Sequence, residues 1–107
     1  MNITQRKPTP IGEILQAEFL EPLNLKIGEL AEILDVHRNT ASAIINNNTR
    51  LTPEMALKLA KAFDTTPEFW LNLQTAVDMW ELSHNSRFQQ SLAKVKIAHQ
   101  VAFPTFA

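Results

Sequence analysis

Apolar residues recur at intervals of three and four residues along most of this 107-residue chain. This spacing places them on one face of an α-helix, and five such stretches with short connections predict five helices before His84. Three of the stretches begin with a Thr-Pro pair, in which the hydroxyl caps free N–H groups and proline takes the first helical position. These pairs are Thr9-Pro10, Thr52-Pro53 and Thr66-Pro67. The first 84 residues therefore predict an all-α fold.

The first helix carries the apolar stripe Ile11, Ile14, Leu15 and Phe19. Because proline cannot continue a regular helix, we expect this helix to end before Pro22.

Two short helices are predicted in the centre of the chain, from Lys26 to Leu34 and from Arg38 to Asn46. Asp35-Val36-His37 separates them, and asparagine after the second helix tolerates the left-handed conformation that ends a helix. The inward positions of the second helix are Ala41, Ile44 and Ile45, and its outward positions are Arg38, Asn39, Ser42, Ala43 and Asn46. Two short helices joined by a three-residue turn, the second with a polar outer face, predict a helix-turn-helix.

The outward side chains suit the edges of base pairs in a major groove about 12 Å wide. Arg38 can bind guanine, Asn39 can bind adenine, and Thr40 or Ala43 can touch a thymine methyl group. Residues suited to phosphate follow, namely Ser42, Asn47, Asn48, Thr49 and Arg50. The alternative is that Asn39 and Thr40 are simply first-turn residues of a solvated helix.

The charge distribution changes the picture given by a net charge of −1 and a pI near 6.3. Residues 36–61 carry four bases against one acid, whereas residues 8–35 carry six acids against one base and residues 64–81 carry four acids and no base. A local basic face can bind phosphate whatever the overall sum. The alternative is that these blocks are ordinary solvated helix faces.

Composition excludes several other classes of function. Zero cysteines exclude disulfides, thiolate zinc sites and thiol nucleophiles, and two glycines exclude a Gly-rich phosphate loop. No apolar run approaches the ~18 residues of a membrane span. His37, His84 and His99 are too scattered for a metal pair, and no serine lies in an elbow motif, so we expect neither an enzyme nor a cofactor.

Three regions are expected: a flexible N-terminal arm over 1–8, a DNA-binding domain over 9–84 and a C-terminal extension over 85–107. In the extension, Phe88, Leu92 and Val95 fit helical spacing, whereas Val95, Ile97, Val101 and Phe103 fit strand alternation. We favour a short helix that passes into an extended segment, with a second subunit as its partner.

The Thr66–Leu82 stretch has the widest apolar stripe in the chain. We assign Leu73, Val77 and Trp80 to dimerisation, since helix-turn-helix proteins bind two half-sites as dimers. Phe69 and Trp70 are expected to serve the core.

The motif itself resembles the lambda-repressor/XRE-type helix-turn-helix family, through Leu30-Ala31, Leu34, Val36, Arg38-Asn39-Thr40, Ser42, Ile44 and Asn46. Its flanks are similar to the HigA family of antidote proteins over roughly residues 8–82. The segments that carry this second resemblance are Gly12-Glu13-Ile14-Leu15, Glu18 to Leu23, Val36 to Thr40, Thr66 to Gln74 and Val77-Asp78-Met79-Trp80.

The resemblance implies a five-helix lambda-repressor-like fold and an antitoxin function. Such a protein is a cytoplasmic homodimer that binds a palindromic operator at the nucleoid, represses its own operon and neutralises HigB, a RelE-like toxin that cleaves messenger RNA. The alternative is a stand-alone XRE-type repressor without a toxin.

Five positions depart from the family pattern. Lys26 and Ile27 stand where the family has serine or threonine and often glutamine, Asp35 replaces the turn glycine, His37 replaces the cap serine and Asn47 replaces a glycine. Lysine at position 26 can still supply charge to a phosphate, and His37 lies at the start of the second motif helix.

Overall fold

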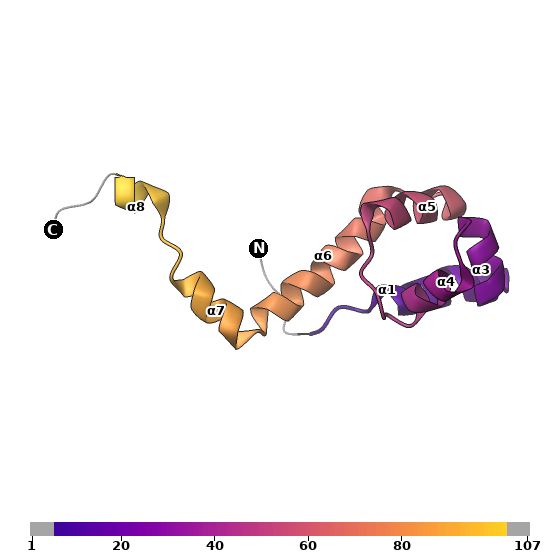
Figure 1. Cartoon of the computed structure of the whole chain (residues 1–107), viewed down its shortest axis with the longest axis horizontal. Helices are drawn as coiled ribbons and strands as arrows, with labels where there is room; N and C mark the ends of the chain where they lie inside the picture. The colour runs from indigo at the N-terminus through magenta and orange to yellow at the C-terminus, as the bar shows by residue number, and fades with distance from the viewer. Residues whose placement is uncertain (1–5, 103–107) are drawn as a thin grey trace.

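In the computed structural model, which describes residues 6–102, every regular element is helical. The elements are α1 (Ile11–Leu15), η1 (Gln16–Leu20), α2 (Glu21–Leu23), α3 (Ile27–Leu34), α4 (Arg38–Ile45), α5 (Pro53–Phe63), α6 (Pro67–Ser83), α7 (Ser86–Ala93) and α8 (Ala98–Ala102). Since α1, η1 and α2 follow one another without a break, the helices before His84 are the five that the sequence predicted. Figure 1 shows α1 to α5 gathered around the first part of α6, with α7 and α8 extending away from them. None of the helices described is long and apolar enough to cross a membrane.

The hydrophobic core lies between the first helical segment and α3 to α6. Trp70 is completely buried at the start of α6, and its indole Nε1 donates to the Thr65 hydroxyl at 2.7 Å. The other fully buried large side chains come from three further helices and are Leu15, Leu20, Leu30 and Leu59. Fully burying a leucine stabilises the fold by about 1.5–3 kcal/mol relative to leaving it exposed. Ala41 and Ile44 of α4 are buried in the same core, which holds this helix in position.

The first helical segment ends at Leu23, and the prediction that it ends before Pro22 was wrong. The π-helical turn η1 ends at Leu20, two residues before Pro22, and contains Glu18, whose carbonyl group the proline ring would clash with in a regular α-helix. The wider π-helical turn moves this carbonyl group. The same turn changes which side chains face inward. Leu15 and Leu20 are both fully buried although they are five residues apart. In a regular α-helix, side chains at this spacing would point to different faces.

Two of the three predicted threonine caps are confirmed. The Thr52 hydroxyl accepts the N–H of Met55, and the Thr66 hydroxyl accepts the N–H of Phe69, each at 3.2 Å. The predicted Thr9 cap was wrong, because the helix starts one residue later and has Pro10 at its N-cap. A distant side chain takes over this role, since Asn47 Oδ1 accepts the Gly12 N–H at 2.8 Å.

The C-terminal extension is helical where an extended segment was expected. After α7, only residues 94–97 leave the helix, and α8 follows at once. The strand alternation expected through Val101 was wrong, and Phe103 lies outside the described residues. Within 6–102 there is no strand for this segment to pair with, so its N–H groups bond locally, as Gln100 and Val101 do to the Ile97 carbonyl.

Candidate DNA-binding interface

The turn between α3 and α4 is set by Asp35, which adopts a left-handed conformation with φ 53°. Its N–H donates to the Glu32 carbonyl at 3.2 Å, and the N–H of Val36 donates to the Ala31 carbonyl at 3.0 Å. Val36 then packs against the core. Aspartate therefore serves where the family pattern has glycine, because its short polar side chain is among those that tolerate this conformation.

His37 caps the start of α4. Its Nδ1 accepts the Asn39 N–H at 3.1 Å, so the imidazole caps the helix at the position where the family pattern has serine. With Nδ1 used as an acceptor, Nε2–H is the donor of the neutral ring. The start of α3 is held differently, since the Lys26 N–H donates to Glu29 Oε1 at 3.0 Å and the Lys26 side chain is exposed.

The two faces of α4 divide as the sequence predicted. Ala41 and Ile44 are buried and Ile45 packs against the core. On the other side, Asn46 Nδ2 donates to Ser42 Oγ at 3.1 Å, which links two outward residues one turn apart. The exposed side chains of α4 and its flanks are His37, Arg38, Asn39, Thr40 and Asn46, while Ser42 and Ala43 are half-buried.

The loop after α4 folds back on the helix. Asn47 has φ 57°, and the Asn48 N–H donates to the Ala43 carbonyl at 2.8 Å. Asn48 and Thr49 are exposed, whereas the Asn47 side chain is engaged with Gly12. The loop thus presents amide and hydroxyl groups beside the polar face of α4.

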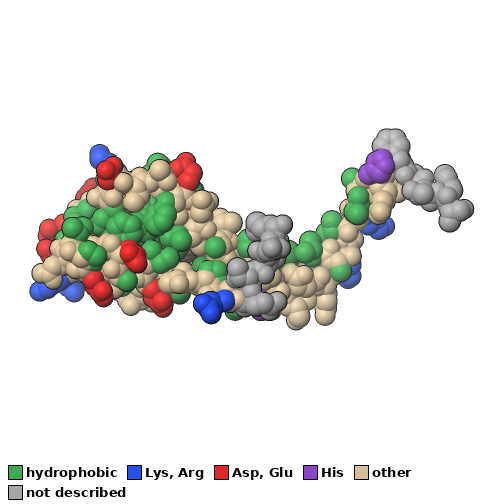
Figure 2. All heavy atoms as spheres, turned by 180° about the vertical axis from the view of Figure 1, so that it is seen from behind, with side chains coloured by type: hydrophobic (Ala, Val, Ile, Leu, Met, Phe, Trp, Pro, Cys, Tyr) green, Lys and Arg blue, Asp and Glu red, His purple; other side chains and the backbone are tan. Residues whose placement is uncertain are grey.

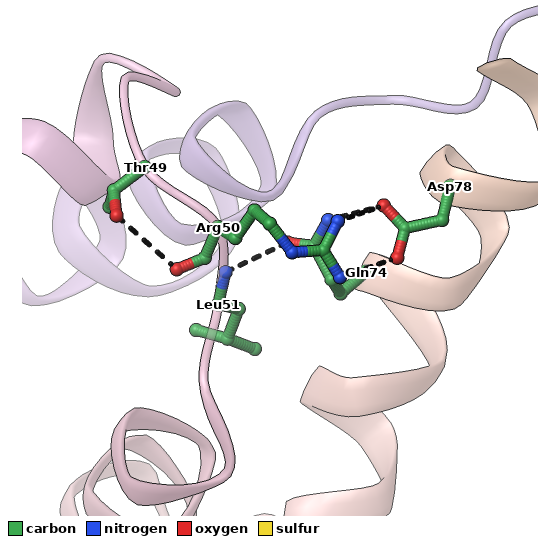
Figure 3. A network of polar contacts seen from close by, with 5 residues as sticks. All are labelled: Thr49, Arg50, Leu51, Gln74 and Asp78. Atoms are coloured by element: carbon green, nitrogen blue, oxygen red, sulfur yellow. Dashed lines mark hydrogen bonds and ion pairs between the residues drawn. The ribbon is translucent and has the colours of Figure 1, made fainter.

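Arg50, at the end of this loop, is bound to α6 (Figure 3). Its Nη1 and Nη2 donate to the two carboxylate oxygens of Asp78 at 2.6 and 2.7 Å. The pair lowers the pKa of Asp78 below its ordinary value and raises the pKa of Arg50, chiefly through these hydrogen bonds. Gln74 completes the network, because its Oε1 accepts the Leu51 N–H at 2.8 Å and its Nε2 donates to Asp78 Oδ1 at 2.9 Å.

A groove of about 350 Å³ lies between this loop, the start of α1 and α6. Ile11 and Val77 give it an apolar lining, and Asp78 and Glu81 give it acidic groups. Lys7 also lines it, with Nζ 5.5 Å from the centroid of the Trp80 ring. The described end of the N-terminal arm therefore lies against α6, while residues 1–5 lie outside the described part of the chain.

The residues assigned to dimerisation lie along α6 in different environments. Leu73 packs against the core of its own chain, whereas Val77 and Trp80 are half-buried at the surface. The Trp80 ring stacks on His84 with 4.1 Å between centroids. Trp70 is in the core as expected, but Phe69 is 38% exposed and contacts Phe19 and Trp70 by its ring edge.

Sequence reasoning missed Gln74 and Asp78. Their spacing of four residues does place them on one face of a helix, which was a usable signal. Their partners, Arg50 and Leu51, lie more than twenty residues earlier in the chain, and no local pattern connects the two segments.

An α3–turn–α4 unit with a polar outer face, held in a bundle by the first helical segment, α5 and α6, defines a helix-turn-helix protein. The helix-turn-helix family matches residues 17–70. Antitoxin HigA-1 of Vibrio cholerae is 48% identical over 96 residues, which are 90% of this chain and 89% of the relative. An HTH-type transcriptional regulator of Haemophilus influenzae is 72% identical over 103 residues, which are 95% of this chain and 96% of the relative.

Solved structures agree with these relatives. Antitoxin GraA in complex with its operator superposes with a TM-score of 0.78 at 33% identity, covering 91% of this chain and 97% of GraA. Pseudomonas aeruginosa antitoxin HigA with the higBA promoter superposes with a TM-score of 0.75 at 28% identity. The match covers 86% of this chain and 99% of that HigA chain. The chain belongs to the HigA family of XRE-type helix-turn-helix proteins.

Proposed function

We propose that this protein is the antitoxin of a type II toxin–antitoxin module. It binds a palindromic operator as a homodimer, represses its own operon and neutralises a RelE-like, messenger-RNA-cleaving toxin of the HigB type. The observation that carries the DNA-binding part is the start of α4, where Arg38, Asn39 and Thr40 are exposed on a helix whose opposite face is buried. The N-terminal residues of a recognition helix are those that reach base edges.

In this proposal Arg38, Asn39, Thr40 and Ala43 meet base edges, and the surrounding polar groups bind phosphate. The exposed positions of His37, Asn48 and Thr49, close to the same face of α4, support phosphate contacts there. Lys26, Ser42, Asn46 and Asn47 complete the proposed set, whereas Arg50, which the sequence also suggested for phosphate, has both terminal nitrogens bound to Asp78. The basic arm over residues 1–8 adds sequence-independent contacts along the DNA backbone.

The homodimer is proposed to form along α6 and the C-terminal extension, with half-sites ~34 Å apart. Exposed hydrophobic side chains run along the described part of this extension (Figure 2). They are Phe88, Leu92, Val95, Ile97 and Val101. Residues 82–102 carry three bases and no acid, whereas residues 64–81 carry four acids. A second copy therefore supplies both an apolar and a complementary charged surface.

The DNA-binding part is tested by fluorescence anisotropy with a duplex from the region upstream of the protein's own gene. We expect affinity to fall steeply between ~50 and 200 mM salt, because several phosphates per subunit release counterions. A scrambled duplex of the same length is the control. Equal affinity for the two duplexes would contradict operator recognition.

The toxin is what separates the antitoxin from a stand-alone XRE-type repressor, a function that the names of relatives such as the Haemophilus influenzae regulator also fit. The antitoxin requires a neighbouring reading frame that encodes a small basic RelE-like protein. Co-expression with that protein should restore growth of cells that it otherwise arrests. A solitary gene, or arrest that persists with both proteins abundant, would favour the repressor. In either case the protein acts in the cytoplasm, at the nucleoid when DNA-bound.

A further inference from the structure

Arg50 occupies a position from which an arginine would be expected to bind DNA. It follows the recognition helix, its side chain is 68% exposed, and the neighbouring loop residues Asn48 and Thr49 are exposed as well. Nevertheless both terminal nitrogens of its guanidinium are already bound to Asp78 (Figure 3). A carboxylate offers the same pair of oxygens as a phosphate, so Asp78 occupies the two donors that a phosphate would use in a bidentate contact.

Asp78 is itself held in place. Gln74 donates to Asp78 Oδ1 at 2.9 Å and accepts the Leu51 N–H at 2.8 Å, so one glutamine orients the carboxylate and also fixes the backbone next to Arg50. Glu81, one turn further along α6, lines the same groove and adds negative potential around the guanidinium. Arg50 therefore stands in an acidic setting formed by α6, despite its exposure.

We propose that Asp78 withholds Arg50 from DNA phosphate and so lowers the electrostatic, sequence-independent part of the protein's affinity for DNA. The inference rests on the proposed DNA binding. It also revises the part assigned to Arg50, which becomes a structural tie between the loop and α6 instead of a phosphate contact.

The physical basis is counterion release. Non-specific binding depends almost entirely on cations that neutralise phosphates, and a neutral Arg50–Asp78 pair contributes no net charge to this. Base edges are read by α4, which Asp78 does not touch. Masking one cation therefore weakens the phosphate contribution to binding by about the same factor for every sequence and leaves direct readout intact.

Asp78→Asn tests this directly, because it keeps the size of the side chain and removes its charge. Binding to a scrambled duplex and to the upstream duplex is measured as a function of salt. Each freed arginine should tighten non-specific binding by about tenfold near 0.1 M salt and steepen the salt slope by about 0.9. Affinity for the upstream duplex should rise by about the same factor, because a phosphate contact adds to binding of every sequence alike.

Two further variants make the result specific to the pair. Glu68→Gln removes one exposed acid from the first turn of α6 and should leave the slope nearly unchanged. Arg50→Ala should leave the salt slope of the wild type unchanged, because Arg50 neutralises no phosphate there, and adding it to Asp78→Asn should abolish the gain. Circular dichroism checks that each variant is folded.

The inference is overturned if folded Asp78→Asn binds scrambled DNA no more tightly than wild type, or if Arg50→Ala alone lowers the salt slope by about 0.9. The second test stands even if Asp78→Asn fails to fold. A wild-type protein that binds neither duplex would instead overturn the proposed function.

Discussion

Asn47 caps the first helix from across the molecule: its Oδ1 accepts the Gly12 N–H at 2.8 Å, although the two residues are 35 positions apart. The approach is so close that a Cβ on Gly12 would stand 2.1 Å from the Ile45 carbonyl oxygen and 2.7 Å from that of Ile44. Gly12 therefore allows the end of α4 to pack directly on the start of α1. The loop that follows α4 is positioned by this contact.

Gly12→Ala should destabilise the protein by several kcal/mol. The new methyl group would overlap backbone atoms, which cannot rotate away as a side chain would, and overpacking of a core by one methyl group already costs ~1–3 kcal/mol. Urea denaturation followed by circular dichroism measures the change. Gly28→Ala is the matched control, since nothing lies within 4 Å of its Cβ position, and alanine inside α3 should stabilise by roughly 0.5–1 kcal/mol. Equal stability of the two variants would contradict the close packing at Gly12.

Arg38→Ala should separate folding from operator binding. Arg38 is exposed at the first position of α4, and exposed substitutions usually change stability by less than ~0.5 kcal/mol. A lost bidentate contact to guanine costs ~1–3 kcal/mol, so operator affinity should fall ten- to a hundredfold while non-specific affinity falls far less. Anisotropy titrations with both duplexes measure this. Normal repression of a promoter reporter by the variant would show that Arg38 does not read the operator.

Trp80→Glu should dissociate the proposed dimer, because it places a charge on the half-buried surface of α6 between the bundle and the extension. Sedimentation velocity at micromolar concentration measures the assembly state. Leu57→Glu is the control, since Leu57 is 59% exposed on α5, outside the proposed interface. A dimeric Trp80→Glu protein would move the interface away from this part of α6.

The Arg50–Asp78 pair should give stability a dependence on acid. Because Arg50 lowers the folded-state pKa of Asp78 below 3.8, the contribution of the pair is fully present above pH 3.8 and disappears as pH falls through the lower folded value. The difference in unfolding free energy between wild type and Asp78→Asn should therefore shrink only below pH 3.8. NMR titration of the Asp78 carboxyl checks the sign, and Arg50→Ala should return its midpoint toward the ordinary value.

The helix-turn-helix was predictable because its signals are local. Thr52 and Thr66 mark helix starts by side-chain chemistry alone, and the inward set of α4 follows from its period. Asparagine after α4 was expected to tolerate the left-handed conformation that ends a helix, and Asn47 adopts it. Asp35, at the position of the family's turn glycine, adopts it as well. Such features depend on residues within one or two turns of one another.

Features that depend on distant partners were not predictable in the same way. The cap of α1 comes from Asn47, and the loop is tied to α6 through Asp78, contacts that exist only once the chain has folded. In the C-terminal extension, by contrast, a local pattern predicted the wrong secondary structure. Its alternating Val95, Ile97 and Val101 suggested a strand, but a strand needs a neighbour, and within residues 6–102 helical hydrogen bonds satisfy that backbone instead.

The π-helical turn at Gln16–Leu20 has a consequence for how related chains are compared. A π-helical turn holds one more residue than an α-helical turn, so a relative that lacks one residue here can form a regular helix and still present an equivalent buried side chain after it. Sequence alignments between Leu15 and Glu21 therefore need room for a single-residue gap. In this segment, the residue of such a relative that is equivalent to Leu20 is the one buried at the same place in the core. An alignment without a gap would match Leu20 to a residue that faces another direction.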